Sequence, residues 1–101
     1  MNSYVTNLYM KPTPGATSQR LTPGASTVAS FATPAKATKA VSFDVQTNDV
    51  FMTIDGSTPT NTNGHKLYAG RAYTISFGSA TNAQFVSASG TAVIFGSELT
   101  T

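Results

Sequence analysis

The stretch that decides the fold is VFMTI at residues 50–54, followed at once by DGSTPT at residues 55–60. Val50, Met52 and Ile54 fall on one face of an extended chain, and this period of two is typical of a β-strand with one buried side. The run stops at Asp-Gly, where Gly tolerates a positive φ, and the Pro that follows ends strand pairing. We therefore predict a strand that enters a tight turn.

The same rhythm of short apolar run and turn continues on both sides of this stretch. Residues 41–45 alternate in the same way, and the polar turn at residues 47–49 predicts a hairpin with residues 50–54. Strands are expected again at residues 71–77, 84–89 and 92–95. A recurrence about every ten residues indicates an all-β fold, a small antiparallel β-sandwich of the immunoglobulin-like or jelly-roll-like type.

The N-terminal forty residues lack this rhythm. Prolines at positions 12, 14, 23 and 34 each remove a backbone donor and favour extended conformations. We therefore divide the chain into an extended, Pro/Gly-rich basic arm at residues 1–40 and a β-sandwich module at residues 41–101. Within the arm we expect a short strand at residues 4–10, two type II turns in the related stretches TPGAT (13–17) and TPGAS (22–26), and a short helix over residues 33–40.

A module of about sixty residues buries little apolar surface and usually needs reinforcement. The chain has no cysteine, which excludes disulfides and thiolate metal sites. The remaining routes to stability are oligomerisation and docking onto a partner. We expect a homo-oligomer or a chain that works on a larger assembly.

Charge is sparse, at 10% of residues with a net charge of +2, and it is unevenly distributed. All four charges of residues 1–40 are positive, whereas residues 41–101 carry four acids and two bases. An acidic protein surface fits such an arm, a merely solvated arm is the alternative, and four charges are few for nucleic acid. We expect the arm to bind its partner through apolar anchors and steering charges: Tyr4, Leu8, Lys11, Arg20, Leu21, Val28, Phe31, Lys36 and Lys39.

The polar loop at residues 55–65 is the other candidate site, because loops of this length usually have a role. Its Asp55, Asn61, Asn63 and His65 are the residues that we expect to take part in recognition. The three oxygen-bearing side chains suit a hard cation, but their spacing matches no EF-hand, and hydrogen-bonded turns explain them as well. His65 is the only histidine, so a catalytic triad or histidine metal site is poorly supplied. We expect no enzyme activity and no cofactor.

Residues 50–60, with Gly64-His65, Leu67-Tyr68-Ala69-Gly70 and Phe85-Val86-Ser87-Ala88, resemble two groups of proteins. One is the immunoglobulin-like accessory domain of chitobiase-type glycosidases. The other is the small β-sandwich virion protein of tailed bacteriophages, of the capsid decoration, cement or head-fibre type. The resemblance covers residues 41–99, and because the chain carries no attached enzyme we favour the phage group.

That resemblance implies a non-enzymatic virion structural protein that decorates or cements the capsid, often as a trimer, with the major capsid protein as partner. The alternatives are a carbohydrate-binding or adhesion module and a tail or head-fibre component. The chain begins without a signal sequence and has no apolar run of membrane-spanning length, so we expect synthesis in the host cytoplasm and a place in the virion. Deleting residues 1–40 is expected to leave a folded module that no longer docks.

Overall fold

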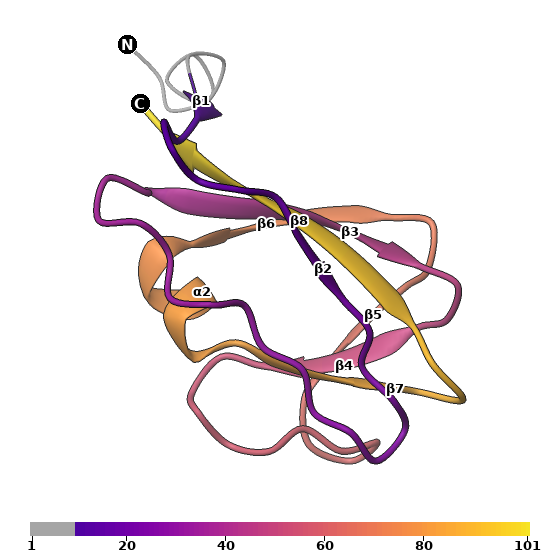
Figure 1. Cartoon of the computed structure of the whole chain (residues 1–101). Helices are drawn as coiled ribbons and strands as arrows, with labels where there is room; N and C mark the ends of the chain where they lie inside the picture. Colours follow the sequence, from indigo (N-terminus) through magenta and orange to yellow (C-terminus); the bar gives the residue numbers. More distant parts are fainter. Residues whose placement is uncertain (1–9) are drawn as a thin grey trace, which may run out of the picture.

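The computed structural model describes residues 10–101, and in this part of the chain two antiparallel β-sheets face each other as a sandwich (Figure 1). The predicted all-β sandwich is therefore confirmed. The larger sheet contains β1 (Lys11–Pro12), β2 (Gln19–Leu21), β3 (Ala40–Gln46), β6 (Ala72–Ser76) and β8 (Val93–Thr100). The smaller sheet contains β4 (Val50–Thr53), β5 (His65–Leu67) and β7 (Gln84–Ser87).

Strand β8 is the central strand of the five-stranded sheet, with partners on both sides. It pairs with β3 along one side, and β3 pairs in turn with β6. Along its other side β8 pairs twice with the N-terminal segment, with β1 near its end and with β2 near its start. The three-stranded sheet has the order β5-β4-β7.

The predicted hairpin between residues 41–45 and 50–54 is wrong. Strands β3 and β4 lie in different sheets, and the turn between them carries the chain across the sandwich. Thr47 adopts a φ of 77° in this turn. A hairpin and a crossing turn share the same local pattern of two alternating runs, so only the partners of each strand distinguish them. Strand β4 also ends at Thr53, which leaves Ile54 exposed.

The core lies between the two sheets and is built around three phenylalanine rings. The rings of Phe43 and Phe85 lie 5.4 Å apart, and Phe31 lies 5.8 Å from the first and 5.5 Å from the second, measured between centroids. Tilted and edge-to-face arrangements of this kind are favourable. Aliphatic side chains from both sheets complete the core: Val41, Val45, Val50, Met52, Leu67 and Ile94.

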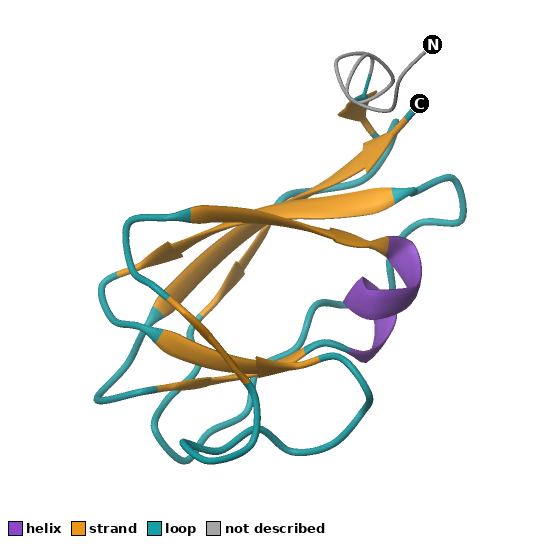
Figure 2. Ribbon diagram, turned by 180° about the vertical axis from the view of Figure 1, so that it is seen from behind, coloured by secondary structure: helices purple, strands orange, loops and turns teal. Residues whose placement is uncertain are grey.

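The N-terminal segment, which we define as residues 10–39, is extended as predicted, but it does not form an arm separate from the module. Beyond β2, Ala29 exchanges two backbone hydrogen bonds with Phe85, of 3.0 and 2.9 Å, so the segment passes from the edge of β8 to the edge of β7. Phe31 then enters the core, where only 7% of its surface stays exposed. The segment therefore closes one side of the sandwich, where Figure 1 shows it in indigo and purple across the front. The view from behind in Figure 2 shows the two sheets with the helix at one end between them.

Glycine at position 96 makes room for Phe31. A methyl group at Gly96 would approach Cε1 of Phe31 to 2.6 Å, which is far inside van der Waals contact. The same strand position faces Phe43, whose Cβ would lie 3.5 Å away. The phenylalanine of the segment thus occupies a slot that only glycine on β8 leaves open.

The observed turns agree in part with those predicted from the sequence. Gly56 has a φ of +84°, as expected for the Asp-Gly turn, and residues 54–64 form the expected loop between β4 and β5. Gly15 has a φ of +79°, and the Ala16 N–H donates to Thr13 O, so the first Pro-Gly pair forms the predicted type II turn. Gly24 has no positive φ and instead exchanges hydrogen bonds with Thr27, so the second copy of the repeat differs.

Helix α2 (Phe77–Asn82) stands where the sequence predicted the end of a strand and a turn. Ser76 caps this helix by accepting a hydrogen bond from the Ser79 N–H, and Ala80 is the helix residue that faces the core. The helix expected over residues 33–40 is absent, since a turn at residues 35–38 leads directly into β3. The strand expected at residues 4–10 falls almost wholly outside the described residues. In residues 10–101 no helix is long and apolar enough to span a membrane.

Candidate functional site

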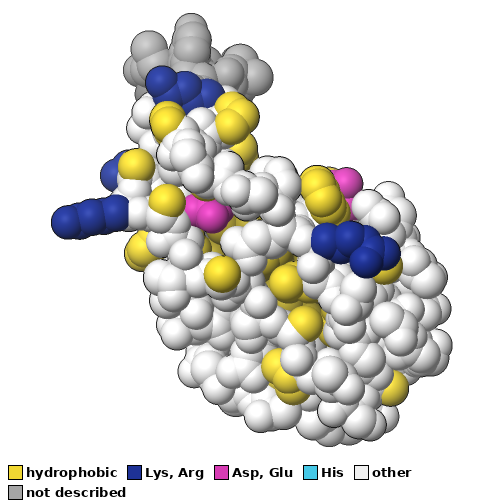
Figure 3. Space-filling view, in the orientation of Figure 1, with side chains coloured by type: hydrophobic (Ala, Val, Ile, Leu, Met, Phe, Trp, Pro, Cys, Tyr) yellow, Lys and Arg dark blue, Asp and Glu magenta, His cyan; other side chains and the backbone are white. Residues whose placement is uncertain are grey.

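Three of the four predicted steering charges gather at one end of the sandwich. Lys11 lies on β1 opposite Thr100, and the Lys39 N–H donates to Leu99 O at 2.8 Å on the other side of β8. Lys36 lies in the turn between them, which a hydrogen bond of 2.9 Å from the Thr38 N–H to Ala35 O closes. All three lysines are exposed. Figure 3 shows basic side chains at this end, over β1 and the loop before β3. We call these three lysines the basic end.

The one acidic side chain at the basic end is already engaged. Glu98 Oε1 accepts hydrogen bonds of 2.6 Å from both the Ala35 N–H and the Thr38 hydroxyl. The Thr38 hydroxyl also lies 3.1 Å from the buried Thr13 hydroxyl, and the Thr13 N–H donates to Glu98 O at 2.9 Å. Glu98 therefore fixes the loop that carries Lys36 and forms no ion pair with the three lysines. Their positive charge faces solvent at the tip of a molecule that measures 41 × 25 × 23 Å.

The other predicted anchors lie apart from the basic end. Arg20 is exposed on the outer face of the five-stranded sheet, beside Phe95. Leu21 packs half-buried against the core, and Phe31 belongs to the core itself, so neither is free to bind a partner. Val28 is 39% exposed. Tyr4 and Leu8 lie outside the described residues.

Three of the four predicted loop residues meet at one hollow. Asp55, Asn63 and His65 line a depression of about 260 Å³ beside β4. The Ser57 hydroxyl and then the Ser57 backbone N–H donate to Asp55 Oδ1, at 2.6 and 3.0 Å, and they lower the pKa of this carboxyl. The amide of Asn63 donates to Thr58 O at 3.2 Å. Within the loop, Asp55 Oδ1 is thus engaged by Ser57. Residues 10–101 contain no cluster of three His, Cys, Asp or Glu residues.

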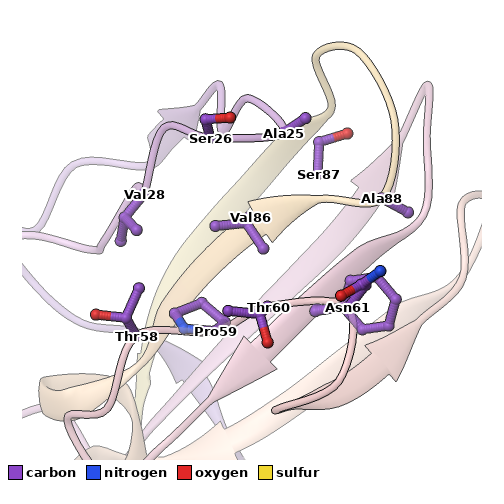
Figure 4. Close-up of a pocket in the computed structure, with 11 residues that line it drawn as sticks. Ala25, Ser26, Val28, Thr58, Pro59, Thr60, Asn61, Val86, Ser87 and Ala88 are labelled. Carbon is purple, nitrogen blue, oxygen red and sulfur yellow. The ribbon is translucent and has the colours of Figure 1, made fainter.

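The fourth loop residue, Asn61, lines a larger groove of about 350 Å³ on the outer face of the three-stranded sheet. Figure 4 shows one wall at Ala25, Ser26 and Val28 and the other at residues 58–61, with Val86 between them. Phe51 completes the floor. No charged side chain lines this groove, and hydroxyl and amide groups alternate with apolar surface along it.

Sequence reasoning missed the floor of this groove. Phe51 alternates with the buried Val50 and Met52, so the strand pattern already places it on the outer face, where a large aromatic residue is a signal for binding. Beside it Lys66 and Tyr68 form a cationic and aromatic group, with the Lys66 ammonium 6.0 Å from the Phe51 ring and 5.6 Å from the Tyr68 ring. The wall at residues 25–28 had no such signal, because it depends on where the N-terminal segment packs.

Compared with protein-family models, with curated proteins and with solved structures, the chain matches none.

Proposed function

We propose that this chain is a non-enzymatic structural subunit of a virus particle, which decorates or cements a bacteriophage capsid. The observation that carries the proposal is the basic end. Lys11, Lys36 and Lys39 project from one tip of the sandwich, and the only acidic side chain among them, Glu98, is held by its own hydrogen bonds. A compact positive tip is suited to an acidic protein surface, because complementary charge steers the encounter and fixes the orientation of the two partners.

The proposal also agrees with how little charge the rest of the surface carries. Only 10% of the residues are charged, so little repulsion opposes a closely packed array of copies on a shell. A subunit that binds only the assembled shell stabilises that shell by mass action, and many weak copies act together. The partner in this proposal is the major capsid protein, or another virion protein, through an acidic patch. A tail or head-fibre location would use the same contact at a different place.

The experiment is to express the tagged chain in the cells that produce the particles and to purify the particles on a density gradient. The wild-type chain should band with assembled particles, and a K11E/K36E/K39E variant should remain in the unassembled fraction, with at least tenfold less chain per particle. K66E is the matched control, since Lys66 is exposed on the opposite part of the molecule in β5, and it should bind as the wild type does. Absence of the wild-type chain from assembled particles would contradict the proposal.

A second function is favoured by the groove at Phe51. An aromatic floor with hydroxyl and amide groups on the rim is suited to a neutral sugar, whose apolar ring face packs on the aromatic and whose hydroxyls bond to the rim. In that case the chain is a carbohydrate-binding or adhesion module. Binding to an array of neutral glycans that is lost in F51A and kept in F77A, a change at an exposed phenylalanine elsewhere, would establish this second function and set the first aside.

A further inference from the structure

The outer face of the five-stranded sheet carries two opposite charges placed symmetrically about an exposed aromatic ring. Phe95 on β8 pairs with Arg20 on β2 and with Asp44 on β3. Paired residues of neighbouring strands point to the same face, so the three side chains form a row across the sheet. All three are exposed, and Phe95 keeps 43% of its surface in solvent, more than all but one of the large apolar residues described.

The two charges of this row are too far apart to satisfy each other. Two strand spacings separate β2 from β3, which places Arg20 and Asp44 about 10 Å apart. In residues 10–101 the only ion pair joins Lys66 and Asp49. Arg71 lines a shallow hollow together with Asp44, but its guanidinium lies over the Tyr68 ring at 5.7 Å and forms no ion pair with Asp44. Arg20 and Asp44 are thus both available to an outside partner.

The outward side chains along β8, at right angles to this row, are largely apolar. Along β8 the outward positions alternate with the buried Ile94, and they are Val93, Phe95, Ser97 and Leu99. The neighbouring row, which crosses β8 at Ser97, β3 at Ser42 and β6 at Thr74, contains only hydroxyl side chains. The middle of the face therefore offers an apolar stripe with small neutral neighbours and one charge of each sign on either side.

Two copies of such a face fit together in one way. A two-fold axis that runs along β8 in the plane of contact lays the stripe on itself and exchanges the positions of Arg20 and Asp44, so each arginine meets the aspartate of the other copy. An axis across the strands would instead set Arg20 against Arg20. Sheets that pack face to face with strands nearly aligned are a common arrangement. We infer that the outer face of the five-stranded sheet is a two-fold interface between two copies of this chain.

The size of the face sets the strength of this dimer. Eight residues of β8 at ~3.3 Å each and four strands at ~4.8 Å give a footprint on the order of 500 Å² per copy. Two copies together would bury about 1,000 Å², which is just below the ~1,200–2,000 Å² of stable specific interfaces and in the range of weak ones. We expect a dimer whose population depends on concentration in the micromolar range. The inference does not depend on the proposed function, because the basic end and the groove are separate from this face.

Sedimentation equilibrium of the full-length chain from ~5 to ~500 μM tests the interface by charge reversal. The wild type should reach the mass of a dimer. R20D and D44R should each raise the dissociation constant at least tenfold, because each sets like charges against each other, and the double variant R20D/D44R should restore the wild-type value. K36D is the matched control and should dimerise normally, because exposed Lys36 belongs to the basic end and not to this face. Far-UV circular dichroism should show that all variants stay folded.

Three results would overturn the inference. They are a wild-type mass that stays monomeric at every concentration or fits a trimer, single variants that associate as the wild type does, and a double variant that fails to recover.

Discussion

Between Ala40 and Thr100 the chain alternates buried and exposed residues along paired strands, whereas residues 10–39 contain only two short strands of two and three residues. Yet the two regions share one core, because Phe31 lies between Phe43 and Phe85. In residues 40–100, which we call the later region, the alternation of buried and exposed side chains along the strands produces the sandwich. The N-terminal segment joins this sandwich through a few specific contacts. A strand edge or a core slot can thus be filled by a segment that has no strand pattern of its own.

The comparison also explains how the sandwich protects its edges. On the side covered by the N-terminal segment, β1 and β2 pair with β8 and Ala29 pairs with β7. Unpaired edges of β-sheets invite association with other chains, and covering them is a common solution. The segment therefore supplies both a core residue and the cover for two edges, and the predictions below are designed to separate these contributions.

The largest effect is expected from deleting residues 1–39. The sequence alone predicted a folded module after such a truncation, but the structure leads to the opposite expectation, since the deletion opens the edges of β8 and β7 and removes Phe31 from the core. The truncated chain should lack a cooperative thermal transition and dispersed amide NMR signals. A chain without residues 1–9 keeps every contact described above and is the control. A truncated chain that melts cooperatively would show that residues 40–101 fold alone.

The next largest effect is expected from Phe31→Ala. Truncation of a buried phenylalanine costs ~3–5 kcal/mol through lost burial and the cavity left behind. Val28→Ala is the control within the same segment, because Val28 is exposed and its loss should cost less than ~0.5 kcal/mol. Urea unfolding of both variants measures the difference. Equal destabilisation by the two changes would place Phe31 outside the core.

A smaller effect is expected from Gly96→Ala. The new methyl group would collide with the Phe31 ring, and overpacking of this kind costs ~1–3 kcal/mol. Gly78→Ala in helix α2 meets open space and should instead stabilise the protein by ~0.5–1 kcal/mol, because alanine is the better helix former. Thermal melts of the two variants should therefore shift in opposite directions. A Gly96→Ala protein as stable as the wild type would mean that Phe31 is not held in this slot.

The smallest effect concerns Asp55, which belongs to the later region and makes only local contacts. Hydrogen bonds from Ser57 favour the charged carboxyl and lower its pKa. Their contribution is present above the ordinary pKa of ~3.9 and is lost as the pH falls through the lowered value in the folded protein. An NMR titration of the Asp55 carboxyl should show this low value, and Ser57→Ala should raise it. An unchanged titration in Ser57→Ala would remove the hydroxyl as the cause.

The sequence predicted much of the later region because alternation and turn residues are local signals. The runs at residues 41–45, 50–53 and 84–87 are strands, and Gly56 forms its turn. The turn at Thr47 crosses between the two sheets where the sequence predicted a hairpin. Which of the two forms depends on the long-range partners of each strand, and local alternation does not encode these partners. Helix α2 was missed because its glycine and polar residues are weak helix formers, although Ser76 three residues before Ser79 is a capping signal.

The candidate sites were predictable only where single residues carry the signal. Lys11, Lys36 and Lys39 were expected to steer a partner, but their gathering at one tip depends on both sides of β8 being paired. Phe31 was expected to bind a partner because a large aromatic in a polar, Pro-rich segment suggests an anchor. The structure places that anchor in the chain's own core, since Gly96 opens a slot for it.

Hydrogen exchange of the Ala29 amide tests most directly whether residues 10–39 belong to the sandwich. This amide donates to Phe85 O at 3.0 Å, and the Phe85 amide donates back to Ala29 O at 2.9 Å. If the segment is part of the fold, both amides should exchange slowly and at similar rates, through the same cooperative opening. Exchange of the Ala29 amide at the rate of an unstructured peptide, beside a protected amide in β3, would show that the N-terminal segment is a free arm.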